Sequence, residues 1–296
     1  MPDPGANAKG HRHREDWVPG QSRDESAPIR LAFREARRAA RALPDFPGDI
    51  PRSLEAAYAL QSAAIAEWPD RVAGWKVGFI APHQRDRFPA ERLVGPIFAA
   101  DIQRAEPGGT VDVPSIAGGF TAIEAEVLLC LATDVAPAAA PWGTDLQPLI
   151  KAAHLGVEPA GSPLSSINDL GPAVIVSDFG NNAGLIVGPA LPDWRRILNG
   201  HAAELTVDTF IDGTLVGTGT PDSIPNGPLG ALRFLLDHAA ARGLTLPAGT
   251  WVSTGAVTGV HRVDAGAAGR IVATGVDPIA LRIVAARPRA ADTGGQ

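Results

Sequence analysis

The sequence is poor in cysteine, lysine and aromatic residues, and it contains no long apolar run. Its single cysteine, Cys130, excludes an intrachain disulfide and a zinc site built from several cysteines. No segment reaches the roughly 18 consecutive apolar residues that a membrane-spanning helix needs. The net charge of -6 provides no basic field for nucleic acid or an anionic membrane. We therefore expect a cytoplasmic globular protein, without a signal peptide because the N-terminal segment has no apolar stretch.

Lysine is scarce. Only Lys9, Lys76 and Lys151 occur among the 26 basic residues, and all the others are arginine. Arginine remains charged in proteins, whereas a desolvated lysine can release its proton near neutral pH. In a chain that uses arginine almost everywhere, a retained lysine is a candidate functional residue.

Composition divides the chain into an arm and one domain. Residues 1–25 are rich in Gly, Pro and charge, which predicts a flexible N-terminal arm. Residues 26–296 are long enough for a single domain with a sizeable core. Within it we expect a helical part over 26–70 and a β-rich core over 71–290.

Two helices are predicted in the helical part. Apolar residues three and four apart indicate one helix from Ser26 to Leu43 and another from Ser53, a good N-cap, to Trp68. Gln61 lies on the apolar face of the second helix, either at its edge or in a functional role. Five arginines of the first helix are expected to form a solvated face: Arg30, Arg34, Arg37, Arg38 and Arg41.

Beyond residue 70, short β-favouring segments alternate with turn signals. Asp212-Gly213 between two such segments predicts a hairpin. Helices are expected at 145–155 and 228–242, with a helical turn at 193–198. Helices followed by many strands, without steady alternation, predict an α+β fold with a mixed or mostly antiparallel sheet. The predicted strands are 75–80, 94–99, 124–133, 173–176, 185–187, 205–211, 215–218, 251–253, 269–274 and 279–284.

Three glutamates form a candidate metal site. Glu124 and Glu126 are two apart at the start of an apolar strand, so their carboxylates point to the same face. Two like charges are costly in a buried setting unless a divalent cation lies between them or one carboxyl is protonated. The alternative is a strand end that faces water. Glu158, as a third carboxylate, would complete an oxygen site suited to Mg²⁺ or Mn²⁺.

Three further segments could carry chemistry. Lys76 lies between Trp75 and Val77, which predicts a desolvated amine whose pKa falls and which can act as an acid or base. The alternative is a lysine on the wet face of a strand. Asp178 follows the predicted strand 173–176 and is either a site residue or part of an Asx-turn. The hydroxyl and amide groups of residues 253–255 could hold a carboxylate.

In combination, these segments resemble the fumarylacetoacetate hydrolase superfamily, in particular its 2-hydroxypentadienoate hydratase and 4-oxalocrotonate decarboxylase branch. The resemblance covers about residues 50–285. Gly-aromatic-Lys-x-Gly followed by Glu-x-Glu is its most specific part. It is carried by Ala57–Gln61, Gly74–Gly78, Gly95–Phe98, Glu124–Glu126, Val157–Pro159 and Ser177-Asp178.

The resemblance implies a mixed β-sandwich roll with flanking helices and a homo-oligomer. It implies Mg²⁺ or Mn²⁺ at Glu124, Glu126 and Glu158, with Lys76 facing a bound 2-oxo acid. Lys76 and Asp178 are the candidate catalytic residues. The candidate substrate-binding residues are Gln61, Thr254 and Gly255.

The implied activity is that of a metal-dependent lyase of aromatic catabolism, which stabilises the enolate of a 2-oxo acid. Hydration of a 2-hydroxy-2,4-dienoate is the first expectation. Decarboxylation or C–C bond hydrolysis of a related 2-oxo acid is the alternative, and so is a non-catalytic subunit that binds a metal and an acid. The chain differs from the family by lacking an arginine after Glu158 and an acid before Gly95. A small-molecule partner is expected, and nucleic acid and membrane are not.

Overall fold

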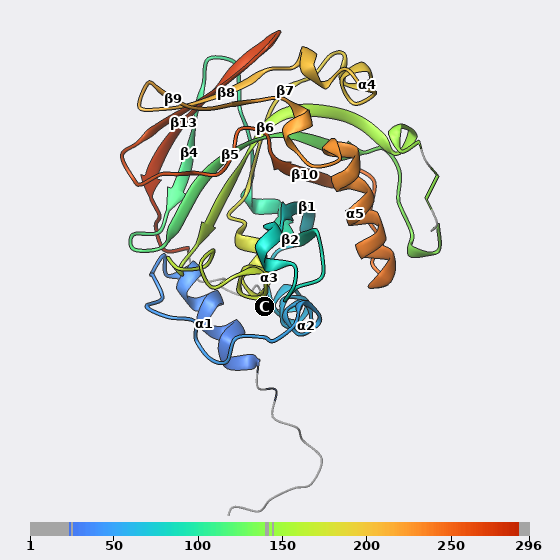
Figure 1. Cartoon of the computed structure of the whole chain (residues 1–296). Coiled ribbons are helices and arrows are strands. Elements are labelled where there is room, and N and C mark those ends of the chain that lie inside the picture. The colour runs from blue at the N-terminus through green and yellow to red at the C-terminus, as the bar shows by residue number, and fades with distance from the viewer. Residues whose placement is uncertain (1–23, 25, 140–141, 144, 290–296) are drawn as a thin grey trace, which may run out of the picture.

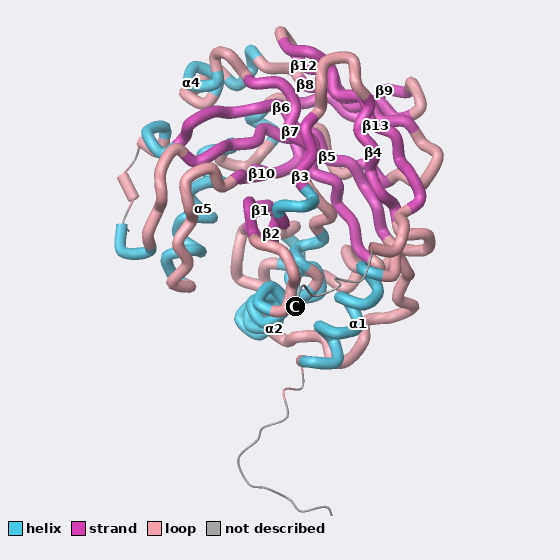
Figure 2. Tube along the Cα trace, turned by 180° about the vertical axis from the view of Figure 1, so that it is seen from behind, coloured by secondary structure: helices cyan, strands magenta, loops and turns pink. Residues whose placement is uncertain are grey.

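Two mixed β-sheets form the centre of the protein in this computed structural model, which describes residues 24, 26–139, 142–143 and 145–289. Apart from Asp24, the predicted N-terminal arm lies outside the described residues. Figure 1 shows α1, α2 and α3 together at one end of the sheets, and α5 beside β10. Figure 2 shows the same division from behind, with the strands gathered away from α1 and α2.

The larger sheet has eight strands in the order β2-β1-β10-β5-β6-β7-β3, with β11 paired to β5. Strands β1 and β10 are parallel, whereas β5 is antiparallel to both of its neighbours, β10 and β6. The sheet consists of β1 (Val72–Phe79), β2 (Arg92–Phe98), β3 (Ile102–Arg104), β5 (Phe120–Leu131), β6 (Ile150–Ser162), β7 (Leu185–Ala190), β10 (Trp251–Ala256) and β11 (His261–Arg262).

The smaller sheet has five strands in the order β4-β13-β12-β8-β9. The predicted Asp212-Gly213 hairpin joins β8 to β9, with both turn residues at positive φ. The strands are β4 (Thr110–Ser115), β8 (Val207–Ile211), β9 (Thr214–Gly219), β12 (Ala268–Ala273) and β13 (Val276–Ala285). The mixed sheets and the helices confirm the predicted α+β class.

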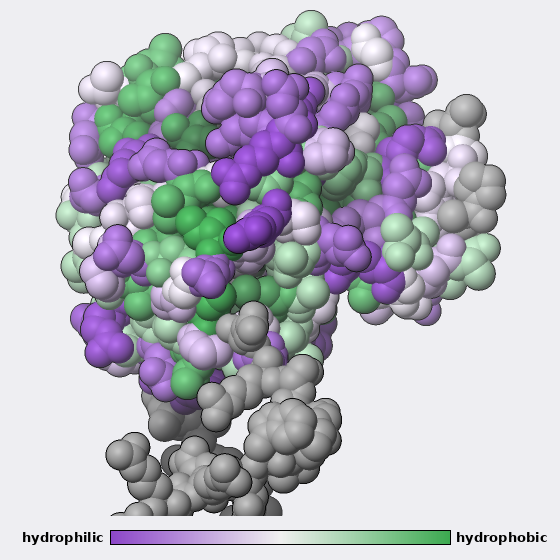
Figure 3. Space-filling model, turned by 60° about the horizontal axis from the view of Figure 1, so that its bottom comes forward, coloured by the Kyte–Doolittle hydropathy of each residue, from purple (hydrophilic) through white to green (hydrophobic). Residues whose placement is uncertain are grey.

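The helices of the described chain are α1 (Ala27–Arg38), α2 (Leu54–Ala66), α3 (Pro172–Ser177), α4 (Trp194–Ile197) and α5 (Gly227–Ala241). The N-cap prediction for α2 is confirmed, because the Ser53 hydroxyl accepts a hydrogen bond from the amide of Ala56 at 3.2 Å. None of the described helices has the length and hydrophobicity needed to cross a membrane. Figure 3 views the helical end, where apolar surface is recessed between polar side chains.

Two segments were assigned to the wrong kind of secondary structure, and the first helix ends at Arg38 and not at Leu43. Residues 145–155 do not form the predicted helix. A 3₁₀ turn at Gln147–Leu149 is followed by strand β6, which begins at Ile150 and pairs with β5 on one side and β7 on the other. Residues 173–176 belong to the short helix α3 and not to a strand. Residues 173–176 are apolar and mostly buried, and the apolar residues within 145–155 have a spacing that also fits a helix. Periodicity therefore cannot distinguish strand from helix in them, and long-range pairing decides.

The predicted solvated arginine face of α1 is also wrong for two of its members. Arg30 is buried and pairs with Glu67, its Nη2 lying 2.7 Å from Oε1. The Arg37 side chain is 13% exposed and reaches residues of β6 and of the segment after α3. Both arginines lie next to the apolar stripe of α1, so packing of the helix on the molecule buries them.

Candidate metal centre

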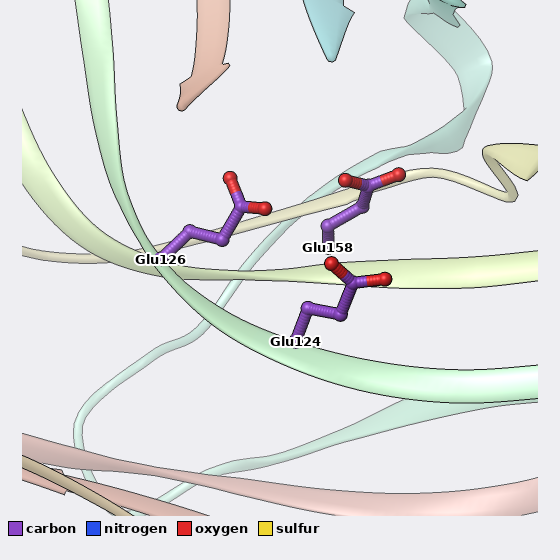
Figure 4. A group of neighbouring side chains, drawn as sticks. All are labelled: Glu124, Glu126 and Glu158. Atoms are coloured by element: carbon purple, nitrogen blue, oxygen red, sulfur yellow. The ribbon is translucent and has the colours of Figure 1, made fainter. Parts of the chain in front are cut away.

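The three predicted glutamates converge in the interior of the larger sheet. Antiparallel pairing of β5 and β6 places Glu158 directly opposite Glu124, and Glu126 is two residues further along β5. Each contributes a carboxylate oxygen such that all three oxygens lie within 4.8 Å of one another (Figure 4). All three side chains are buried. The two glutamates of β5 thus share one face, as the period of a strand requires, and β6 supplies the third.

Strand β10 orients Glu126. Its Oε2 accepts hydrogen bonds from the Ser253 hydroxyl at 2.5 Å and from the Gly255 amide at 3.0 Å. Its Oε1 is buried and has no hydrogen-bond partner among the described residues. A buried carboxylate oxygen without a partner is energetically unfavourable unless something positive binds it. Together, the three carboxylates and the unpaired oxygen of Glu126 form a set of hard oxygen donors, which fits Mg²⁺ or Mn²⁺.

Glu158 contacts two neighbours through the same oxygen. Its Oε1 accepts a hydrogen bond from Asn182 Nδ2 at 3.1 Å and lies 3.2 Å from Lys76 Nζ. Lys76 comes from β1, which is separated from β5 by β10 alone. The sheet order therefore brings one amine and three carboxylates together from segments far apart in the chain.

Burial and neighbouring negative charge raise the pKa values of the two glutamates of β5. Burial raises the pKa of Glu124 to about 7, and the charge of Glu158 contributes to the rise. The pKa of Glu126 lies well above its usual value, because burial and the neighbouring Glu158 and Glu124 outweigh its hydrogen bonds. Protons thus stabilise the ion-free site. A divalent cation can replace them, since ligating carboxylates must be deprotonated.

Lys76 is buried as predicted, but the predicted direction of its pKa shift is wrong for the ion-free protein. Burial lowers the pKa of Lys76, yet the charges of the three glutamates outweigh burial and leave it above its usual value. Around its stem, a Cβ built on Gly180 would lie 3.1 Å from Lys76 Cδ, and one built on Gly78 would lie 3.3 Å from Cε. The glycines therefore allow backbone to pack against the lysine.

Asp178 is buried and held by two partners. Its Oδ1 lies 2.6 Å from Arg37 Nε, and its Oδ2 accepts a hydrogen bond from the Ser162 hydroxyl at 2.6 Å. Both carboxylate oxygens are therefore engaged by the protein. The proposed catalytic role of Asp178 remains a prediction, and its contacts in this structure are those of an anchor.

The predicted substrate-binding residues also make internal hydrogen bonds. Gln61 Nε2 donates to the carbonyls of Val94 and Val176, at 3.1 and 3.0 Å. The Thr254 hydroxyl donates to the carbonyl of Val127 at 2.7 Å. Gly255, with φ +113°, donates its amide to Glu126. Substrate binding by these residues remains a prediction.

Two residues of the site were not selected from the sequence. Asn182 stands in a polar cluster after α3, but nothing local distinguishes it from its neighbours as the partner of Glu158. Arg37 follows Ala36 of the apolar stripe, as Arg30 follows Ile29 one heptad earlier. Arg34 and Arg41 also follow residues of the stripe without being buried, so this position alone could not have identified the two arginines.

No family model matches the sequence, and no curated protein matches it. Solved structures do. The chain is similar to 4-oxalocrotonate decarboxylase from Pseudomonas putida G7, with a TM-score of 0.71 and 19% identity over 90% of this chain and 99% of that one. It is also similar to fumarylpyruvate hydrolase from Pseudomonas aeruginosa, with a TM-score of 0.51 and 17% identity, covering 74% of this chain and 91% of that one.

A third similar structure is a Yersinia pestis CO92 protein assigned to the fumarylacetoacetate hydrolase family, with a TM-score of 0.51 and 16% identity. The match covers 73% of this chain and 95% of that one. The chain therefore shares the fold of these solved structures, which is the fold that the resemblance of its motifs predicts.

Proposed function

We propose that the protein is a metal-dependent enzyme that acts on a 2-oxo acid by stabilising its enolate. The observation that carries the proposal is the convergence of Glu124, Glu126 and Glu158 on one point beside Lys76. The solved structures of similar fold support it. The decarboxylase was solved with calcium and acetate and with magnesium and adipate, and the hydrolase with Mn²⁺ and pyruvate.

Glu124, Glu126 and Glu158 would hold Mg²⁺ or Mn²⁺. The ion, when bound, supplies Lewis acidity toward the oxygens of the acid. Lys76, whose Nζ lies 3.2 Å from Glu158 Oε1, is the residue that we propose moves a proton to or from the substrate carbon. Burial around the amine and the carboxylates excludes bulk water, which strengthens charge interactions within the site.

Two reactions fit this arrangement. In hydration of a 2-hydroxy-2,4-dienoate, the double bond gains a proton on one carbon and hydroxide on the other. In decarboxylation, CO₂ leaves and a proton takes its place on carbon. Hydration is the reaction we propose first. Decarboxylation is the second candidate, favoured by similarity to the decarboxylase over 90% of the chain. C–C bond hydrolysis of a 2-oxo acid is a further reaction of the same enolate.

Metal binding tests the first part of the proposal. We expect Mn²⁺, titrated by calorimetry, to bind one site per chain, and Glu124→Gln and Glu126→Gln each to weaken binding strongly without unfolding the protein. Glu106→Gln, at an exposed glutamate, is the matched control and should bind as wild type does. Unchanged Mn²⁺ affinity in both site variants would contradict the proposed ligands.

Turnover tests the second part. The metal-loaded protein is incubated with 2-hydroxydienoates and 2-oxo acids, and substrate loss, CO₂ and the oxo product are measured. Loss of dienoate absorbance with a hydroxylated oxo product of unchanged carbon number indicates hydration. Two shorter products indicate C–C bond hydrolysis, and CO₂ release indicates decarboxylation. Metal binding without turnover of any of these acids would show instead a non-catalytic subunit that binds a metal and an acid.

A further inference from the structure

Residues Asp178–Asn182 form an unusual turn beside the candidate metal centre. Three consecutive residues have left-handed backbone conformations, with φ +54° at Phe179, +71° at Gly180 and +61° at Asn181. This conformation is unfavourable for residues that carry a Cβ, and it persists only when surrounding contacts enforce it. The turn therefore depends on whatever holds its two ends.

The turn touches the centre on two sides. At its end, the Asn182 side chain donates to Glu158 Oε1, the oxygen that also faces Lys76. In its middle, the backbone of Gly180 packs against the stem of Lys76, so closely that a Cβ there would lie 3.1 Å from Cδ. The position of the turn thus sets the orientation of Glu158, a predicted metal ligand, and it forms part of the surroundings of the Lys76 side chain.

A single arginine of α1 holds both ends of this turn. Arg37 Nε lies 2.6 Å from Asp178 Oδ1, Nη1 donates to the Asn182 carbonyl at 3.1 Å, and Nη2 donates to the Gly161 carbonyl of β6 at 2.9 Å. The rigid fork of a guanidinium can satisfy three such acceptors at once, which the single ammonium of a lysine cannot do in the same geometry. Arg37 therefore joins the turn to the strand that carries Glu158.

We propose that Arg37 is a positioning residue for the metal centre, acting through the turn and Asn182 on Glu158, although it belongs to the N-terminal helix and is not a ligand. The proposal rests on the proposed function in one respect, namely that the carboxylates hold a divalent ion. Partners that hold a ligand in place typically change metal affinity by about 10- to 100-fold when they are removed.

The experiment measures Mn²⁺ affinity and hydrogen exchange in Arg37→Gln and in a matched control, Arg30→Gln. Both changes remove a largely buried arginine and its ion pair from α1, but Arg30 pairs with Glu67 and Asp24 and, among the described residues, makes no hydrogen bond or ion pair with the turn. We expect Arg37→Gln to bind Mn²⁺ at least about tenfold more weakly, and to exchange the amides of residues 178–184 faster. Arg30→Gln should match wild type in both.

Two further variants keep the proposal open to refutation. If Arg37→Gln does not fold, Arg37→Lys takes its place, because it retains the charge. We expect Arg37→Lys to fold and to bind Mn²⁺ more weakly than wild type but less weakly than Arg37→Gln. In an Asn182→Ala background, Arg37→Gln should cause little additional loss of affinity, because both changes break the same connection. Wild-type affinity in Arg37→Gln, an equal loss in Arg30→Gln, or fully additive losses with Asn182→Ala would overturn the proposal.

Failure of the proposed function would look different. If wild type binds no Mn²⁺, or binds it no more tightly than Glu124→Gln does, the metal site is absent. The exchange measurement then decides the role of Arg37 by itself: faster exchange at 178–184 in Arg37→Gln supports its hold on the turn, and unchanged exchange refutes it.

Discussion

Lys76 is the residue on which the proposed chemistry depends most. It is one of only three lysines, it is buried, and it faces Glu158. When no cation neutralises the three glutamates, their negative charges raise the pKa of Lys76 and keep the amine protonated. Compensation of those charges by a bound cation leaves burial as the main influence, and burial favours the neutral amine. The same site thus provides a reason for lysine where the chain elsewhere uses arginine.

We expect Lys76→Met to lower turnover by about 10²- to 10⁴-fold, the usual contribution of a general acid or base. Methionine fills a similar volume without a polar group, so folding should be retained and Mn²⁺ should bind as in wild type or more tightly. Lys76→Arg should not restore turnover, because arginine keeps its proton. The comparison requires steady-state rates and Mn²⁺ titrations of the three proteins.

Either of two results would contradict this role. Full activity in Lys76→Met would show that the residue takes no part in the reaction. Wild-type activity in Lys76→Arg would show that it acts only as a fixed positive charge toward the substrate carboxylate.

Glu124 predicts a pH dependence of stability in the ion-free protein. Its pKa is about 7 in the folded state, against 4.5 without the protein environment. The folded protein therefore binds more protons between these values, so this stabilisation is complete below the lower value and is lost as pH rises through about 7. With a chelator present, the melting temperature should fall between about pH 5 and about pH 8.

Two comparisons isolate this effect. Glu124→Gln should flatten the fall, whereas Glu106→Gln should follow wild type. Added Mn²⁺ should raise the melting temperature more at about pH 8 than at about pH 5, because the carboxylate ligands must be deprotonated to bind the ion. An equal effect of Mn²⁺ at both pH values would argue against carboxylate ligands.

At the scale of elements, strand β2 and the turn Asp178–Asn182 are in backbone contact. A Cβ on Gly95 would lie 2.2 Å from the Phe179 carbonyl oxygen and 2.8 Å from Gly180 Cα. Backbone atoms cannot move aside as a flexible side chain can. The Gly95–Phe98 segment of the family resemblance therefore has a steric reason for its glycine in this chain.

We expect Gly95→Ala to displace the turn. Overpacking of this kind typically destabilises by about 1–3 kcal/mol, and the displacement should also weaken Mn²⁺ binding through Asn182. Gly143→Ala is the control, because a Cβ there would meet nothing within 4 Å. Thermal melting and Mn²⁺ titration test both variants. A Gly95→Ala protein with wild-type stability and affinity would show that the turn adjusts without consequence.

For the whole molecule, we expect residues 1–25 to be dispensable. Their composition lacks the apolar groups needed to pack. Of this segment the structure describes Asp24, which lies 2.7 Å from Arg30. Asp24 is exposed and Arg30 also pairs with Glu67, so loss of the contact with Asp24 should change stability little. A protein that begins at Ser26 should keep its melting temperature within a few degrees.

The same truncated protein tests the predicted homo-oligomer. Light scattering should give the same assembly with and without the arm. A large loss of stability, or a change of assembly, would mean that the arm packs on the domain or on a neighbouring subunit.

The sequence by itself determined the features that depend on local geometry. Glu124 and Glu126 are two residues apart, so they lie on one face of any strand. The helix α2 begins at Ser53 because the side chain of Ser53 caps a free backbone amide. The family motifs were sufficient to predict the fold. The metal ligands could be predicted as types, since oxygen donors on one face imply a hard cation.

Only the tertiary structure decided which distant groups meet. Glu158 lies opposite Glu124 because β6 is a strand, which its own residues did not reveal, and the register of β5 and β6 is set by pairing along their whole length. Residues 173–176 became a helix, and Arg37 became buried against Asp178, for the same reason. Local propensity differs little between such alternatives, and contacts between segments that are distant in the sequence outweigh it.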